Sequence, residues 1–119
     1  MYGLFHSCNE LQEIIGLDGL TSTSLITNGA QSMFQSCTVL SFSSAGSNLS
    51  DAFGTGLGAC STLDYMFYDV GYTTPGVAPN VTNFDTTSVQ SLTAMFQRSK
   101  FTTTIDITGW NVPALTTMS

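Results

Sequence analysis

Cysteine, histidine and aspartate side chains are the groups of this 119-residue chain that could carry chemistry. A zinc site would need more ligands than Cys8, Cys37 and Cys60 provide, because no two of them form a Cys-x-x-Cys pair. Any histidine-based catalysis must use His6, the single histidine. Gly-x-Ser-x-Gly, His-Glu-x-x-His and phosphate-loop patterns are absent from the sequence. The sequence therefore predicts no catalytic residue, no metal site and no cofactor, and favours a protein that is not an enzyme.

Six aspartates could form a calcium site if the fold brought several of them together. They are Asp18, Asp51, Asp64, Asp69, Asp85 and Asp106. No stretch of the chain resembles an EF-hand loop. Asp85 and Asn111 occupy matching places in successive repeats, and such side chains commonly cap turns by accepting backbone hydrogen bonds. Turn capping is therefore the favoured interpretation, and calcium binding stays an alternative.

Charge excludes several classes of partner. Charged residues make up 8% of the chain, against a usual share of about 25%. The net charge is −6, and Arg98 and Lys100 are the only cationic residues. Nucleic acids and anionic lipid surfaces attract basic patches, so neither is an expected partner. No run approaches the roughly 18 apolar residues of a membrane span, so we expect no membrane insertion of this segment.

One apolar phrase recurs along the whole chain. In Leu92-Thr93-Ala94-Met95-Phe96, apolar residues stand at i, i+3 and i+4, the spacing of one face of a helical turn. The phenylalanines that mark the phrase are about 30 residues apart, a period that is typical of repeat arrays. The coils of the array are expected at about 5–33, 34–66, 67–95 and 96–119. The predicted structural core of the repeats is Leu4, Phe5, Met33, Phe34, Met66, Phe67, Met95, Phe96 and Met118.

Two cysteines share one column of the repeat. Cys8 and Cys37 stand three residues after their phenylalanines, where later repeats have Val70 and Ser99. A repeat position that is occupied by Cys, Val or Ser indicates a small and mostly buried side chain. Packing is therefore the favoured role, while a Cys8–Cys37 disulfide between neighbouring coils stays open. Cys60 belongs to another column and is expected in the core.

Segments that interrupt the repeat are the expected carriers of specificity. Ile105-Asp106-Ile107 alternates like a half-buried strand, whereas residues 43–59 and 70–82 break the repeat with turn-forming residues. Variable loops of a repeat array commonly carry binding. The candidate interaction residues in these loops are Ser47, Asn48, Tyr72, Pro75 and Pro79.

Residues 83–96, Asn-Phe-Asp-Thr-Thr-Ser-Val-Gln-Ser-Leu-Thr-Ala-Met-Phe, resemble the recurring phrase of BspA-like leucine-rich repeats, surface-protein repeats also described as DUF285 or mycoplasma-lipoprotein type. Residues 5–11 and 34–40 resemble the adjoining phrase, and the resemblance covers essentially the whole chain. Residues 54–58, Gly-Thr-Gly-Leu-Gly, depart from the family's Asp-Thr-Ser run. The resemblance implies an extracellular or cell-surface protein that takes part in adhesion or assembly.

The expected fold is a right-handed α/β solenoid of leucine-rich-repeat type, with about four coils of short strand and short helical turn. Residues 1–119 are expected to form a single array, and the equivalent places of Met1 and Met118 in the register indicate an excerpt from a longer one. The expected function is a non-catalytic structural or interaction module that binds protein or glycan at a cell surface. The alternative is a self-assembling fibre or filament segment, built by end-to-end stacking of copies.

Overall fold

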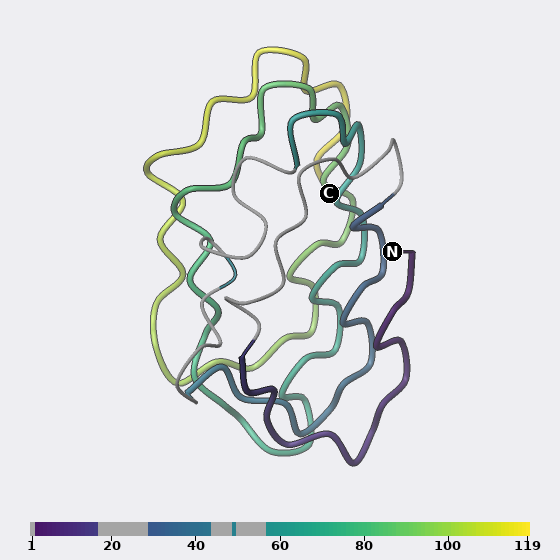
Figure 1. Cartoon of the computed structure of the whole chain (residues 1–119), viewed down its shortest axis with the longest axis vertical. Helices are drawn as coiled ribbons and strands as arrows, with labels where there is room; N and C mark the ends of the chain where they lie inside the picture. The colour runs from purple at the N-terminus through teal and green to yellow at the C-terminus, as the bar shows by residue number, and fades with distance from the viewer. Residues whose placement is uncertain (1, 17–28, 44–48, 50–56) are drawn as a thin grey trace.

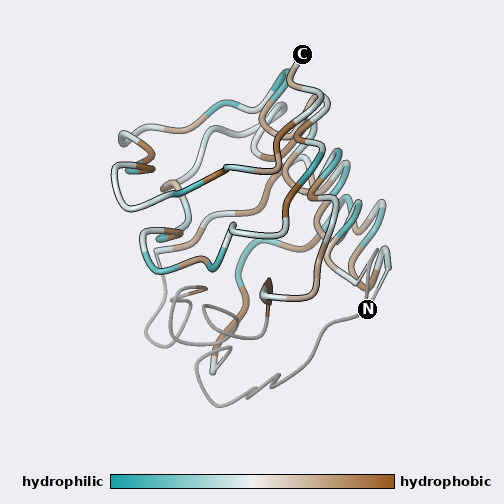
Figure 2. Ribbon diagram, turned by 90° about the horizontal axis from the view of Figure 1, so that it is seen from above, coloured by the Kyte–Doolittle hydropathy of each residue, from teal (hydrophilic) through white to brown (hydrophobic). Residues whose placement is uncertain are grey.

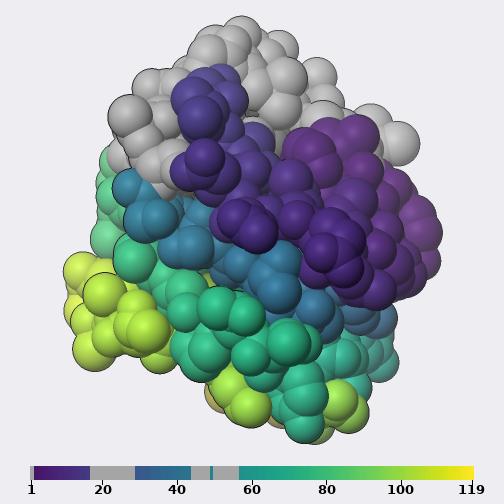
Figure 3. Space-filling model, turned by 90° about the horizontal axis from the view of Figure 1, so that it is seen from below, coloured from purple at the N-terminus to yellow at the C-terminus, as the bar shows by residue number. Residues whose placement is uncertain are grey.

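The recurring apolar phrase forms tight turns in every repeat. The structure, a computed structural model, describes residues 2–16, 29–43, 49 and 57–119. Four continuous stretches of turn, named here the turn segments, are residues 2–7, 29–36, 64–71 and 93–98. They lie side by side in sequence order, and the two termini lie at opposite ends of the row (Figure 1, Figure 2). In a space-filling view the repeats accordingly appear as successive bands (Figure 3).

Backbone hydrogen bonds join each turn segment to the next. The amides of Phe5, Phe34 and Phe67 donate to the carbonyl oxygen of the residue before the next phenylalanine, at N···O distances of 2.9, 3.0 and 2.9 Å. The residues two positions later donate to the carbonyl oxygen of the residue after the next phenylalanine, as Asp69 does to the Gln97 oxygen at 3.1 Å. The intervening amides donate to the carbonyl three residues earlier in their own segment. Alternate amides therefore bind repeats together, and the others hold each turn.

Left-handed backbone makes this alternation of directions possible. The residues two before and two after each phenylalanine have φ between 51° and 62°, and they are Gly3, Ser7, Ser32, Ser36, Tyr65, Asp69, Ala94 and Arg98. An α-helix has negative φ throughout, so the predicted helical turns are wrong. The composition is consistent with this outcome, because Ser, Thr and Gly are weak helix formers that favour turns.

The predicted α/β solenoid of leucine-rich-repeat type is also wrong. Helix makes up 2% of the structure and strand 5%, and the described residues form no sheet. Among them, only Leu49 and Leu57 have helical backbone, as single residues. Residues 105–107, expected as a strand, pair with no neighbouring strand within the described ranges. Pairing there consists of three isolated parallel bridges: Thr62 with Ser91, Ser91 with Thr117, and Gly76 with Phe101.

A row of phenylalanine rings runs through the core under the turn segments. Phe5, Phe34, Phe67 and Phe96 stack with successive centroid distances of 5.4, 5.6 and 5.4 Å and interplanar angles of 8°, 8° and 2°. We call these four rings the Phe row. The inner members of the predicted core are buried, namely Met33, Phe34, Met66, Phe67 and Met95.

The outer members of the predicted core are less buried than expected. Leu4 is 49% exposed and Met118 is 74% exposed, while Phe5 and Phe96 are half-buried. The physical reason is that each of these residues belongs to an outermost turn segment or follows it, so another repeat covers it on one side only. Assigning Leu4 and Met118 to the core was therefore a wrong prediction.

The segment expected as a variable interaction loop is partly built into the framework. The amides of Gly71 and Thr73 donate to the carbonyl oxygens of Cys37 and Thr38 on one side, at 3.2 and 2.9 Å. On the other side, Gly76 donates to Lys100 and accepts from Thr102, at 3.3 and 2.8 Å. Residues 71–76 therefore lie between two neighbouring repeats and are bonded to both.

The candidate interaction residues differ in their surroundings. Tyr72 and Pro75 are exposed, as an interaction role requires, but Pro79 is buried and cannot contact a partner. Ser47 and Asn48 lie outside the described residues. In the ranges that the structure describes, no helix is long and apolar enough to cross a membrane.

Candidate functional site

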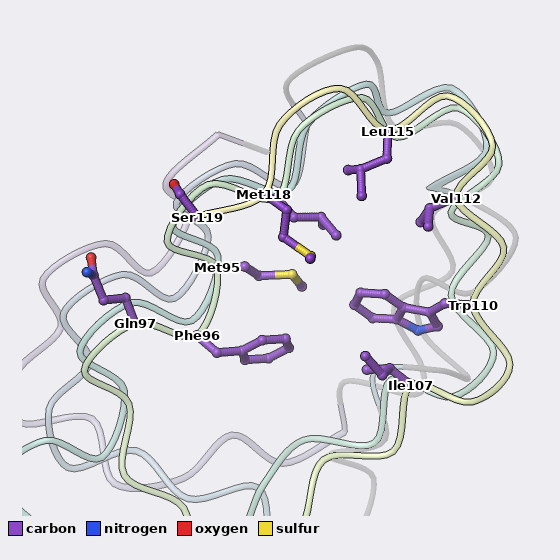
Figure 4. A pocket seen from close by; sticks show the side chains of 10 residues that line it. Met95, Phe96, Gln97, Ile107, Trp110, Val112, Leu115, Met118 and Ser119 are labelled. Carbon is purple, nitrogen blue, oxygen red and sulfur yellow. The ribbon is translucent and has the colours of Figure 1, made fainter.

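An apolar hollow opens beside the last turn segment, residues 93–98 (Figure 4). Its volume is about 600 Å³, and all but two of its ten lining residues are apolar. The principal side chains around it are Met95, Phe96, Ile107, Trp110, Leu115 and Met118. Figure 4 shows the side chains of Met95, Phe96 and Met118 on one wall, facing Trp110 on the other. We call this space the terminal hollow.

A second ring stack fixes one wall of the terminal hollow. Trp110 lies against Phe84 of the preceding repeat, with centroids 6.2 Å apart and planes 7° apart. The indole N–H of Trp110 donates to the carbonyl oxygen of Val81 at 2.8 Å. Because its one polar group is bonded inward, Trp110 presents only apolar surface to the hollow.

Two unused backbone donors border the hollow. In the inner turn segments, the phenylalanine and the residue two positions later donate to the next repeat. The corresponding amides of Phe96 and Arg98 donate no hydrogen bond within the described part of the chain. Ala94 donates to the carbonyl oxygen of Ser119 at 2.7 Å, so only the first of the three donor positions is filled. The open edge therefore combines peptide donors with apolar side chains.

Sequence reasoning identified part of this site but assigned it another role. Met95, Phe96 and Met118 were predicted as core; Met95 is buried, Phe96 is half-buried and Met118 is exposed, and all three line the terminal hollow. Trp110 and Leu115 were not predicted as site residues. The available signal was their register, since they align with Phe84 and Val89, which are buried in the preceding repeat. In the preceding repeat, the next repeat covers the apolar side chains in these columns.

The two cations of the chain gather around one tyrosine. The guanidinium carbon of Arg98 and the Nζ atom of Lys100 lie 4.7 and 4.2 Å from the Tyr72 ring centroid. Arg98 Nε also lies 2.8 Å from Asp69 Oδ1, as an ion pair without hydrogen-bond alignment. The Asp69 charge raises the pKa of Arg98. Because these cations are engaged with neighbours on the chain, the cluster contributes to local order rather than forming an open anion site.

Cys8 and Cys37 are not joined by a disulfide in the structure, which is consistent with a packing role for both. Cys37 is buried and its Sγ atom donates to the carbonyl oxygen of Phe5 at 2.9 Å. Burial raises the pKa of the Cys37 thiol to about 11, and burial likewise raises the pKa of Cys60. Both buried thiols therefore behave as small apolar side chains.

In the native protein, alkylation should be slower at buried Cys37 than at half-buried Cys8. At pH 8, Cys37 is expected to react with iodoacetamide about 100-fold more slowly than in the unfolded chain, because a pKa near 11 leaves little thiolate. The rate should rise as the pH approaches 11, since the thiolate is the reactive form. Mass spectrometry of timed samples measures each site, and half-buried Cys8 serves as the internal reference that reacts first. Equal rates for Cys37 in native and denatured protein would contradict the burial.

Asp85 and Asp106 cap turns. Asp85 Oδ1 accepts from the Thr87 amide at 3.2 Å and from its hydroxyl at 2.6 Å, in agreement with the predicted capping role. Asp106 makes the same pair of contacts with Thr108, and these hydrogen bonds lower the pKa of Asp106. Within the described residues, no three His, Cys, Asp or Glu side chains are close enough together to hold a metal. Asp18 and Asp51 lie outside those residues.

His6 has one side-chain hydrogen-bond partner among the described residues, the hydroxyl of Ser7. Ser7 Oγ and His6 Nδ1 are 2.9 Å apart, and both side chains are exposed. In a serine–histidine hydrolase a third group orients the ring through its other nitrogen. Such a group is not among the hydrogen-bond partners of His6 in the described part of the chain. The contact is a local one between neighbouring surface residues.

Comparison with known proteins identifies a family but no characterised relative. A family model described as "Mycoplasma protein of unknown function, DUF285" matches residues 30–119, which is more than half of the chain. No curated protein and no solved structure matches. The matched residues include the last two turn segments, all but the first residue of the second, and every principal side chain of the terminal hollow. The chain therefore belongs to the DUF285 family.

Proposed function

We propose that this chain is a non-catalytic interaction module that binds an apolar segment of a protein partner in the terminal hollow. The observation that carries the proposal is the pairing of about 600 Å³ of apolar space with the unused amides of Phe96 and Arg98. A polypeptide supplies both complements, because its side chains fill apolar space while its carbonyl oxygens accept from an open backbone edge. A sugar would leave such apolar walls largely uncovered, so protein is favoured over glycan.

The location proposed for the module is the extracellular or cell-surface side. Its support is the resemblance of residues 83–96 to BspA-like surface repeats, which is an argument by analogy. Antibody labelling of intact source cells, compared with permeabilised cells, tests it directly. Labelling that requires permeabilisation would refute the location and leave the binding proposal standing.

The single tryptophan gives a direct readout of binding, because Trp110 lines the terminal hollow. The probe is a synthetic peptide of residues 91–99, which carries the apolar spacing of the repeats and no tryptophan. The peptide is expected to shift Trp110 emission to shorter wavelength in a saturable manner, because it excludes water from the indole. A peptide of the same composition in scrambled order should have little effect.

Two variants separate the terminal hollow from the rest of the surface. Ile107→Asp places a charge in the hollow at a side chain that is 49% exposed, so the fold should tolerate it and peptide binding should be lost. Ile15→Asp places the same charge at an isoleucine that is 72% exposed and does not line the hollow, and this variant should bind as the parent chain does. Unchanged emission at every peptide concentration, or equal binding by Ile107→Asp, would refute the proposed function.

A further inference from the structure

We propose that Cys8 and Cys37 form a disulfide bond between the first two repeats when the folded chain meets a small-molecule disulfide oxidant such as oxidised glutathione. The bond joins two turns that already lie side by side in the row of turn segments (Figure 1), so the backbone keeps its path. It involves neither the terminal hollow nor Trp110, and it is therefore independent of the proposed function.

The two cysteines occupy equivalent places in successive turns. The amides of Cys8 and Cys37 each donate to the carbonyl oxygen three residues earlier, both at 3.2 Å. Immediately before them, the amide of Ser7 donates to the carbonyl oxygen of Gln35 at 2.8 Å and joins the two turns. Neighbouring backbone segments joined by such bonds lie about 4.8 Å apart. A disulfide needs a Cα–Cα distance of about 4.4–6.8 Å, so the shared register suits one.

The side chain of Cys37 is directed at the turn that contains Cys8. Its Sγ atom donates to the carbonyl oxygen of Phe5 at 2.9 Å, and the same oxygen accepts from the Cys8 amide at 3.2 Å. Cys37 Sγ therefore lies within two hydrogen-bond lengths of the Cys8 amide nitrogen. The electrostatic surroundings agree: burial is the main reason that the pKa of Cys37 is raised, a hydrogen bond from the Cys8 amide lowers this pKa, and charge on Cys8 raises it.

The third cysteine has different neighbours. Burial raises the pKa of Cys60, and hydrogen bonds from the amides of Ala30 and Gly29 lower it, so this thiol lies against the beginning of the second turn segment. Cys37 follows the end of that segment, where the groups around its thiol belong to the turn of Cys8. Cys60 is therefore a buried cysteine outside the proposed pair, and it provides a matched control.

The bond forms by two successive thiol–disulfide exchanges. One cysteine thiolate attacks a sulfur of oxidised glutathione, the S–S bond of the oxidant breaks, and one glutathione leaves and takes up the proton that the cysteine lost. The second cysteine thiolate then attacks the protein sulfur of the mixed disulfide and releases the other glutathione in the same way. The protein loses two electrons and two protons, and one molecule of oxidised glutathione becomes two molecules of the thiol.

The bond closes a loop of about 30 residues and fastens the first repeat to the second. Such a link stabilises a folded chain mainly by restricting its unfolded states. Disulfides persist outside the cell and are rare in the cytosol, so the bond suits the extracellular location proposed above.

Peptide mapping of the oxidised full-length chain tests the pairing. The folded chain is incubated with oxidised glutathione at about pH 8, where a free thiol is partly ionised. An endoproteinase that cleaves after Glu10 and Glu13 places Cys8 and Cys37 on separate peptides. These peptides are expected to remain joined until a reductant is added, in a monomer whose mass has fallen by two hydrogen atoms. A folded chain that stays reduced, or that keeps glutathione on either cysteine without bridging, would overturn the inference.

Three serine variants identify the sulfurs. Cys60→Ser removes a buried thiol outside the pair and should be cross-linked as the parent chain is. Cys37→Ser removes a buried thiol of the pair, and Cys8→Ser removes its half-buried member, so neither should give joined peptides. Circular dichroism establishes that each variant is folded before oxidation. Joined peptides from Cys37→Ser would assign the bond to Cys60 and overturn the proposed pair.

Thermal unfolding tests whether the bond fits the native turns. The oxidised chain is expected to unfold at a midpoint about 10 °C above that of the reduced chain, because its unfolded states are restricted. Dithiothreitol should reverse the shift, and Cys8→Ser should show no shift after the same treatment. A lower midpoint for the oxidised chain would show that the bond distorts the two turns, and it would overturn the claim that they are placed to receive it.

Discussion

Phe67→Ala is expected to lower the free energy of unfolding by about 3–5 kcal/mol, the usual cost of removing a buried phenylalanine ring. Phe67 is fully buried, and its ring contacts Phe34, Phe42 and Phe96 at centroid distances of 5.6, 6.0 and 5.4 Å. Its loss would interrupt the Phe row in the middle and leave a cavity between two repeats. Urea denaturation followed by circular dichroism measures the change.

Phe5→Ala is the matched control for that substitution. Phe5 belongs to the same row but is half-buried and has a stacked ring on one side only. Less apolar area leaves the core, so the expected cost is no more than about half that of Phe67→Ala. Equal costs at the two positions would show that stacking between repeats is not what stabilises the Phe row.

Gly71→Ala is expected to destabilise the chain by about 2–5 kcal/mol, through two separate effects. Gly71 has φ of +66°, a conformation that costs an L side chain free energy. An added Cβ would also lie 2.6 Å from the backbone oxygen of Lys100, which is itself held by the neighbouring segments. Thermal and urea unfolding should both report the loss.

Gly16→Ala separates the two effects. Gly16 has φ of +79°, but a Cβ added there meets no atom of the described residues within 4 Å. Only the conformational cost remains, so destabilisation should be about 1–2 kcal/mol. If the two alanine substitutions destabilised the chain equally, the close approach of Gly71 to the next repeat would contribute nothing to the cost, in contradiction to the structure.

The repeat register was the part of this fold that the sequence could predict. Met33, Phe34, Met66 and Phe67 were assigned to the core from column alignment alone, and they are buried. Such prediction succeeds because burial depends on which face a residue occupies, and the i, i+3, i+4 spacing defines a face. The match of the DUF285 family model to residues 30–119 confirms that part of the resemblance.

The backbone conformation of the turn segments could not be predicted from the spacing of the apolar residues. Helical turns and the observed alternating turns place the same residues on one face, and the distinction lies in the sign of φ. Ser32, Tyr65 and Ala94 adopt positive φ although none is glycine, so the residue type does not predict the positive φ at these positions. Tertiary hydrogen bonds to the next repeat stabilise this backbone, and a single repeat taken alone does not display them.

The candidate site was missed for a related reason. Trp110 and Leu115 have the same apolar character as the buried residues they align with, so the sequence shows a core column and not an open surface. Whether such a column is covered depends on the neighbouring repeat. The same dependence explains why Leu4 and Met118 were wrongly assigned to the core.

The hydrogen bonds between turn segments also give the molecule an electrical direction. Every hydrogen bond that joins two turn segments runs from the N–H of the earlier one to the carbonyl of the later one. Peptide dipoles aligned in this way leave partial positive charge at the Phe96 edge and partial negative charge at the Leu4 edge. The row of turn segments therefore has a net electric dipole along its length, and its two edges carry partial charges of opposite sign.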